Sequence, residues 1–131
     1  MYLLDTNICI YIINKHSKNA VKKMINLNPQ DIKISSITVA ELEYGASKSE
    51  RRDKNRSALR DFLSPFEIIP FCTQDAEIYG IIRAELEHSG APIGPYDMQL
   101  AAQALARDYI FVTNNTAEFS RIKKLKLENW V

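Results

Sequence analysis

The chain has 131 residues, a length that suits one domain with a buried core, and we expect a single domain over residues 1–131. Its composition, 46% hydrophobic and 25% charged, is typical of globular proteins and argues against a disordered or fibrous chain. The net charge of +1 argues against a protein that coats nucleic acid through bulk positive charge, so any nucleic-acid site must be local.

The N-terminal segment and the cysteines indicate the compartment. Only a short apolar stretch separates Met1 from Asp5, which leaves no room for a signal peptide, and no apolar run reaches membrane-spanning length. We therefore expect a protein of the cytoplasm with no membrane segment. Cys9 and Cys72 are far apart and have no neighbours that would complete a zinc site, so we expect both to be small buried hydrophobic residues.

Short β-prone runs alternate with helical patterns along the chain. The runs are Tyr2–Leu4, Ile32–Ser35, Phe66–Ile69 and Ile110–Val112, with a weaker one at Lys126–Trp130. Between them, apolar residues recur at helical spacing within 21–25, 39–46, 59–63, 78–86 and 98–105. This alternation predicts an α/β fold with a central, mainly parallel sheet, helices on both faces and right-handed crossovers.

Polar residues gather at one edge of this predicted sheet. In such folds the helix N-termini lie at the same edge as the carboxyl ends of the strands, and ligands bind there. The Gly- and Pro-rich stretch 89–95 ends in Pro95, which suits the first position of a helix and would place Asp97 in its first turn. The candidates at this edge are Asp5, Glu41, Asp97, Asn115 and Glu118.

Each of these residues also has a structural explanation of its own. Asp5 could cap the helix that follows it, and Asp97 could stabilise a helix dipole. Two pairs have the spacing of a capping box: Thr38 with Glu41, and Asn115 with Glu118. Capping does not explain why several carboxylates converge, because like charges repel and take up protons unless a cation neutralises them. Mg²⁺, or Mn²⁺ in its place, is the cation that such oxygens prefer. The expected chemistry is metal-assisted cleavage of a phosphate ester.

Four stretches stand in an order and spacing shared with a known family. They are Met1–Ile8 (MYLLDTNI), Ile34–Gly45 (ISSITVAELEYG), Gly90–Ala102 (GAPIGPYDMQLAA) and Val112–Phe119 (VTNNTAEF). With these motifs the chain resembles the PIN-domain ribonucleases, and specifically the VapC toxins of bacterial toxin–antitoxin pairs. The resemblance covers essentially the whole chain and implies one PIN-like domain.

The resemblance also implies roles for the acidic residues. Asp5, Glu41 and Asp97 match the acidic metal-site residues of the family. Asp5 and Asp97 are then the expected Mg²⁺ ligands, and Glu41 would orient or deprotonate the attacking water. Asn115 stands where many PIN domains have a fourth acid, so the missing carboxylate would come from Glu118, or else Asn115 itself would position solvent at the metal. The expected products carry 5′-phosphate and 3′-hydroxyl ends.

Partners follow from the same resemblance. It implies an RNA substrate, with structured RNA such as tRNA as the class, cut in a single-stranded loop. It also implies a homodimer, and a VapB-like antitoxin that joins it in a toxin–antitoxin hetero-oligomer and blocks the site. We expect the antitoxin groove within residues 38–64, where the apolar side chains of Val39, Leu42, Leu59, Phe62 and Leu63 could remain uncovered. Basic residues that could contact phosphate are Lys48, Arg51, Arg52, Lys54, Arg56, Arg60, Arg121, Lys123, Lys124 and Lys126.

Two alternatives stay open and two others fail. A catalytically weak PIN-like RNA-binding module is favoured by Asn115, and a PIN or flap-type nuclease acting on DNA also fits the motifs. A haloacid dehalogenase-type phosphatase needs a second Asp where Asn7 stands, and a receiver-like signalling domain needs an Asp where the chain has Pro70 and Phe71. His16 and His88 lie in hydrophilic surroundings and are expected at the surface, outside catalysis.

Overall fold

A parallel five-stranded sheet organises the fold in the computed structural model, which describes residues 1–131. Its strand order is β3-β2-β1-β4-β5, and every neighbouring pair is parallel. The strands are β1 (Tyr2–Leu4), β2 (Ile32–Ser35), β3 (Glu67–Ile69), β4 (Ile110–Val112) and β5 (Leu127–Glu128). All five predicted runs are confirmed as strands, the third beginning one residue later and the last reduced to two residues.

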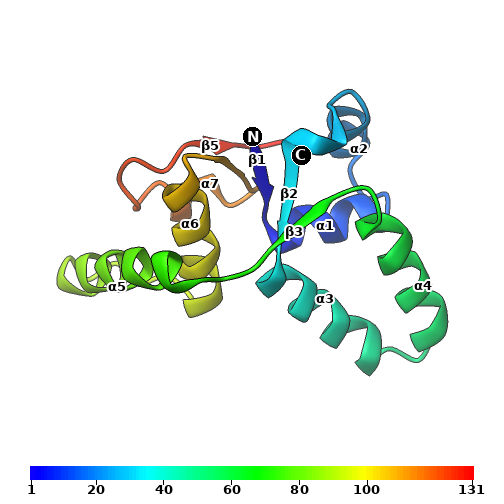
Figure 1. The fold of residues 1–131 in the computed structure, drawn as a ribbon, viewed down its shortest axis with the longest axis horizontal. Coiled ribbons are helices and arrows are strands. Elements are labelled where there is room, and N and C mark those ends of the chain that lie inside the picture. Colours follow the sequence, from blue (N-terminus) through cyan, green and yellow to red (C-terminus); the bar gives the residue numbers. More distant parts are fainter.

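Helices connect the strands and cover both faces of the sheet, as the alternation predicted (Figure 1). They are α1 (Thr6–Ile13), α2 (Lys18–Ile25), α3 (Ser36–Lys48), α4 (Arg52–Leu63), α5 (Thr73–His88), α6 (Pro95–Arg107) and α7 (Thr116–Phe119), with a 3₁₀ turn at Pro29–Asp31. Helices α5 and α6 lie on one side of the sheet, and α1 to α4 lie on the other (Figure 1). None of the helices is both long and apolar enough to cross a membrane.

Two hydrophobic clusters, one on each face of the sheet, form the core. Because side chains alternate along a strand, Leu3 and Phe111 enter the cluster beneath α5 and α6, while Leu4 and Val112 enter the cluster beneath α1 to α4. All four side chains are fully buried. The central strands are therefore apolar on both faces, which explains their continuous apolar runs in the sequence.

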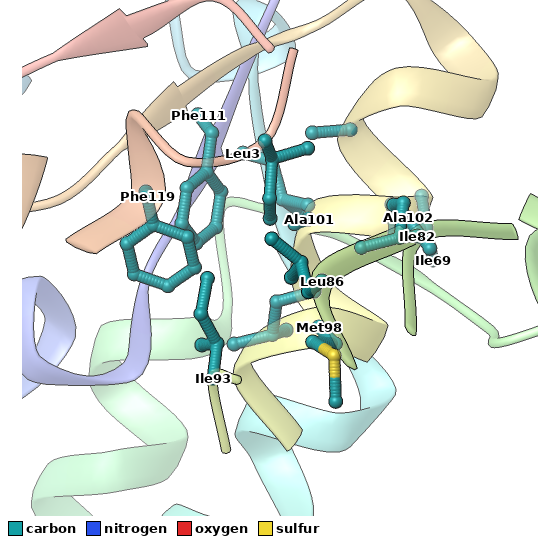
Figure 2. Packing of buried hydrophobic residues seen from close by; sticks show 13 residues of the cluster. Leu3, Ile69, Ile82, Leu86, Ile93, Met98, Ala101, Ala102, Phe111 and Phe119 are labelled. Carbon is teal, nitrogen blue, oxygen red and sulfur yellow. The ribbon is translucent and has the colours of Figure 1, made fainter. Parts of the chain in front are cut away.

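Helix α6 is held tightly against the sheet. Figure 2 shows Ala101 near Leu3 and Ala102 beside Ile82 and Ile69, with Phe111 and Phe119 on the other side of the cluster. The two phenylalanine rings meet edge-on, with centroids 4.8 Å apart and an interplanar angle of 65°. Since the alanines leave room for close approach, the N-terminal turn of α6 has a fixed position at the edge of the sheet.

A polar network fastens α6 to α5. The buried carboxylate of Asp75, near the start of α5, accepts hydrogen bonds from Arg107 at the end of α6 and from the backbone amide of Cys72, the latter at 2.9 Å. Burial acts to raise the pKa of Asp75, but the hydrogen bonds from Arg107 and Cys72 outweigh it, so this pKa lies below its usual value. Asp75 therefore stays ionised and paired.

The cysteine prediction was wrong for one of the two residues. Cys9 is buried within α1, and this burial raises the pKa of its thiol. Cys72 is exposed, because it is the residue that precedes the first turn of α5, where the chain leaves the edge strand β3. His16 and His88 are exposed, as predicted.

The apolar residues expected to form a groove within residues 38–64 are only partly available at the surface, and the antitoxin groove there stays a prediction. Leu42 and Leu59 are buried in the core between α3 and α4, and Val39, Phe62 and Leu63 pack against the same cluster. Leu42 and Leu59 therefore belong to the core, whereas Val39, Phe62 and Leu63 are partly exposed at its rim. The large apolar residue that this pair of helices does expose is Tyr44.

Candidate functional site

Asp5 lies at the carboxyl end of β1, in the middle of the sheet. Its backbone amide continues the ladder by donating to the carbonyl of Val112 at 2.9 Å. Its carboxylate accepts two further hydrogen bonds, from the amide of Thr6 and from the hydroxyl of Thr113, each at 2.8 Å. With only 4% of its surface exposed, Asp5 is held in one orientation by the ends of two adjacent strands.

Burial has a strong electrostatic effect on this carboxyl. Burial, together with the nearby charges of Asp97 and Glu41, raises the pKa of Asp5 from 3.8 to about 6, although the hydrogen bonds from Thr113 and Thr6 act to lower it. A carboxylate in these surroundings needs a positive partner in order to stay ionised. No Lys or Arg supplies one, since the groups that act on its charge are carboxylates and hydrogen-bond donors.

Glu41 reaches the same place from the second turn of α3. Its Oε1 accepts a hydrogen bond from the hydroxyl of Thr6 at 2.9 Å, and the Thr6 hydroxyl lies 3.0 Å from that of Thr38. Because Thr6 has one hydroxyl proton and gives it to Glu41, the remaining proton between the threonines comes from Thr38. This chain of hydrogen bonds fixes one oxygen of Glu41 and leaves the other free.

The structure excludes the alternative explanation of Thr38 and Glu41 as a capping box. Helix α3 begins two residues earlier, at Ser36, and its cap is Ser35, whose side chain accepts from the amide of Ile37 at 3.0 Å. Thr38 and Glu41 lie inside the helix, where their side chains face α1. Their spacing of three residues places both side chains on one helical face, where both contact the hydroxyl of Thr6.

Asp97 enters the site from the first turn of α6. Pro95 is the first residue of this helix, as predicted, and Asp97 is the third. Burial of this half-buried carboxyl raises its pKa above the usual value, and the charges of Glu118 and Glu41 raise it further. The charge of Asp97 therefore interacts with the charges of the other three acids of the site.

Asn115 and Glu118 complete the edge beyond β4. Asn115 is the residue before the first turn of α7, but its side chain makes no capping hydrogen bond, so the alternative explanation of this pair as a capping box is excluded as well. Its amide instead donates to Oε2 of Glu118 at 2.9 Å. Because the charge of Glu118 acts on Asp97, this carboxylate belongs to the same cluster.

The structure thus brings all five sequence candidates to one edge, with four carboxylates that influence one another. No three acidic, His or Cys side chains are spaced closely enough to form a complete metal cage. This donor set still suits Mg²⁺, which commonly binds through one or two carboxylates and takes its remaining ligands from water and substrate phosphate. Asp5 and Asp97 fit that description, since each has an oxygen-only side chain in surroundings that penalise an uncompensated charge.

Sequence reasoning missed two residues that support the site. They are Thr113, which donates to Asp5, and Thr38, which acts on Glu41 through Thr6. Both threonines are fully buried. A signal for Thr113 did exist: β1 and β4 are adjacent with Leu4 opposite Val112, so the residues that follow them, Asp5 and Thr113, must be neighbours.

The predicted basic residues lie outside the acidic cluster. One group lines a polar hollow at the turn from α3 to α4 and includes Arg51, Arg52, Lys54 and Arg56. Arg56 is engaged by Ser47 and Glu43, and Lys126, near the C-terminus, pairs with Asp108 at 3.0 Å. Most of the other predicted basic candidates are exposed and unpaired.

Comparison with known proteins identifies the family. The chain matches the PIN domain over residues 2–125. It is 47% identical over 131 residues to Ribonuclease VapC2 of Rickettsia felis, covering 99% of this chain and 98% of that protein. It is 42% identical over 129 residues to the tRNA(fMet)-specific endonuclease VapC of Shigella flexneri, covering 98% and 97% respectively.

Solved structures agree with these relatives. The VapBC2 complex of Rickettsia felis, bound to a DNA fragment from its promoter, contains a chain that superimposes with a TM-score of 0.93 at 46% identity, covering 99% of this chain and 98% of that one. A chain of the DNA-bound VapBC of Salmonella typhimurium gives a TM-score of 0.94 at 42% identity, with the same coverage. The PIN-like α/β fold predicted from the sequence is therefore confirmed.

Proposed function

We propose that this chain, which belongs to the VapC ribonucleases of the PIN domain family, is a Mg²⁺-dependent endoribonuclease that cuts structured RNA and is held inactive by a VapB-like antitoxin. The observation that carries the metal dependence is the cluster of coupled carboxylates. The pKa of Asp5 is raised to about 6 and that of Asp97 is raised as well, and no cation of the protein compensates for them. A divalent cation bound between such carboxylates would stabilise their ionised forms.

Asp5 and Asp97 would hold the metal. When bound, Mg²⁺ would neutralise charge on the phosphate and favour ionisation of a nearby water, with Mn²⁺ as a substitute. The protein supplies orientation for this chemistry. Thr6 and Thr113 fix the carboxylate of Asp5, and the buried face of α6 fixes the turn that carries Asp97.

Glu41 has the geometry of a general base. Its Oε1 is engaged by Thr6, so the other oxygen would accept a proton from the attacking water. The water oxygen then bonds to phosphorus as the bond from phosphorus to the 3′ oxygen breaks, and the leaving oxygen takes up a proton. The products carry 5′-phosphate and 3′-hydroxyl ends.

The substrate and partners follow the relatives. The Shigella flexneri relative is named for tRNA(fMet), so the substrate class proposed here is structured RNA such as tRNA. The protein would act on this RNA in the cytoplasm. The VapBC complexes, which superimpose so closely, support a VapB-like antitoxin as the partner. A homodimer within that hetero-oligomer belongs to the same proposal.

Parallel digestion tests the activity. With Mg²⁺ present, the protein should cleave a tRNA pool and leave single-stranded DNA of matched length intact, and a chelator should stop cleavage until Mg²⁺ is restored. Gel analysis of end-labelled substrates also reports the end chemistry. Cleavage of DNA at a rate equal to that of RNA would favour the DNA-directed alternative, and binding without cleavage would favour the RNA-binding module.

Glu118 offers a sharper test of how the site is completed. Changing Glu118→Gln should reduce cleavage about 10-fold at limiting Mg²⁺ and should raise the Mg²⁺ concentration needed for half-maximal rate, because the carboxylate next to Asp97 is lost. The double variant Asn115→Asp with Glu118→Gln should recover most of the rate, since it returns a carboxylate to the same pair. An unchanged Mg²⁺ requirement in Glu118→Gln would reduce Glu118 to a hydrogen-bond partner of Asn115.

A further inference from the structure

Two tyrosines lie exposed beside the acidic cluster. Tyr44 on α3 is 65% exposed and Tyr96 on α6 is 60% exposed, although both are large aromatic residues. Each is close in sequence to an acid of the site: Tyr44 is one helical turn beyond Glu41, and Tyr96 directly precedes Asp97. Exposed aromatic rings that share one surface beside a candidate site are typical of a binding surface.

These tyrosines belong to a groove between α3 and α6. Its volume is about 490 Å³, and its lining residues are Ile37, Ala40, Glu41, Tyr44, Tyr96 and Gln99. The α3 residues lie on one face at helical spacing, and Tyr96 and Gln99 form the facing wall by the same rule. Glu41 is both a wall of this groove and a member of the acidic cluster, so the two sites are continuous.

A positive charge lies against the Tyr44 ring of this groove. The ammonium of Lys48 is 4.9 Å from the centroid of the Tyr44 ring, on the side away from Glu41 along α3. The residues from 41 to 48 therefore present a carboxylate, an aromatic ring and a cation in turn, over about 10 Å of helix. This order matches a nucleotide chain whose scissile phosphate lies at the acids, whose adjacent base lies at the aromatic ring, and whose following phosphate lies at the cation.

We propose that Tyr44 and Tyr96 bind the base adjacent to the scissile phosphate, with Lys48 contacting the following phosphate. The inference rests on the proposed function, because it assumes RNA at the acidic edge. The groove and the acidic cluster share Glu41, so a chain that leaves the cut on the side of Glu41 would pass over the two rings. Aromatic side chains bind unstacked bases in this way with little dependence on base identity.

Kinetics of single variants test the role of the rings. Tyr44→Ala and Tyr96→Ala should each lower kcat/KM for an RNA cut in a single-stranded loop by roughly 5- to 150-fold, mainly through KM. Tyr44→Phe and Tyr96→Phe keep the ring and should stay within about twofold of wild type. Ile25→Ala, which removes an apolar residue that is 70% exposed on α2, is the matched control and should change nothing.

An abasic substrate separates base contact from a structural effect. When the base next to the cut is removed from the RNA, kcat/KM of the wild-type protein should fall by the same factor as Tyr44→Ala causes on intact RNA. On the abasic RNA, Tyr44→Ala should cause no further loss of kcat/KM. Equal losses by Tyr44→Ala on intact and abasic RNA would overturn the inference. So would variants that cut normally and differ only in oligomeric mass or in inhibition by the antitoxin, since the groove would then bind a second copy or that protein.

Binding without cleavage keeps this inference distinct from the proposed function. Fluorescence anisotropy with an eight-nucleotide RNA in chelator should show weaker binding by both Ala variants, and Lys48→Gln should reduce the salt dependence by about one phosphate contact. If wild type fails to cut any RNA but binding depends on the tyrosines, the proposed function fails and the inference stands. If wild type cuts RNA but neither cleavage nor binding responds to the tyrosines, the inference alone fails.

Discussion

Asn in place of Asp97, or in place of Asp5, should reduce RNA cleavage by at least about 1000-fold, equivalent to about 4 kcal/mol of transition-state stabilisation. Both changes keep the shape of the side chain and remove its charge, so the metal loses a ligand oxygen of full charge. Because Asp97 lies in the first turn of a helix held by its buried face, the variant should fold normally. Single-turnover cleavage of the tRNA pool at saturating Mg²⁺ measures the effect.

Two controls give that experiment its meaning. Asp61→Asn removes an exposed carboxylate of α4 that lies outside the acidic cluster, and it should cleave at the wild-type rate. Circular dichroism should show unchanged helix content in all three variants. An Asp97→Asn protein that folds and cuts RNA at the wild-type rate would contradict the assignment of Asp97 as a metal ligand.

The fold could be predicted because its signals are local and repeated. The apolar runs at β1, β2 and β4 are buried on both faces and flanked by helices, a pattern that identifies parallel strands directly. The helix boundary at Ser35 was missed for a physical reason. Ser35 and Thr38 are both good caps by residue type, and only the end of β2 decides which of them precedes the first turn.

The residues of the site could be predicted from the sequence, but the hydrogen bonds that position them could not. Topology alone brings Asp5 and Asp97 to one edge, and the structure agrees. The hydrogen bond from Thr113 to Asp5 joins residues 108 positions apart, and it depends on the register between β1 and β4. The solvent exposure of individual side chains could not be predicted either, because helical spacing cannot show that Leu59 is buried while Tyr44 is exposed.

The site is maintained at a cost to the stability of the fold. Asp5 has an ordinary pKa of 3.8 and a folded-state pKa of about 6, so ionising it in the folded protein is unfavourable. Over roughly two pH units this amounts to about 3 kcal/mol. The unfolded chain loses this proton first, and the folded state therefore loses stability as pH rises from about 4 to about 6, with the full penalty present above that range.

Replacing Asp5 with Asn should therefore stabilise the metal-free protein at pH 7.5 by up to about 3 kcal/mol, or about 10 °C in Tm for a domain of this size. Asn can keep both hydrogen bonds, since its oxygen accepts from Thr6 and its amide donates to the hydroxyl of Thr113. At pH 4, where the unfolded carboxyl is partly protonated, the advantage should shrink. Thermal unfolding in chelator at both pH values measures the difference.

Mg²⁺ should remove most of the stability difference between the two proteins. A cation that binds the folded state at 100 times its Kd adds about 2.7 kcal/mol to wild type, which offsets the penalty of the ionised Asp5. Asp5→Asn should gain little from the same addition, and NaCl at equal ionic strength should shift neither protein in this way. An Asp5→Asn protein that is less stable than wild type in chelator would show that the carboxylate stabilises the fold, and would remove the electrostatic argument for a metal at this edge.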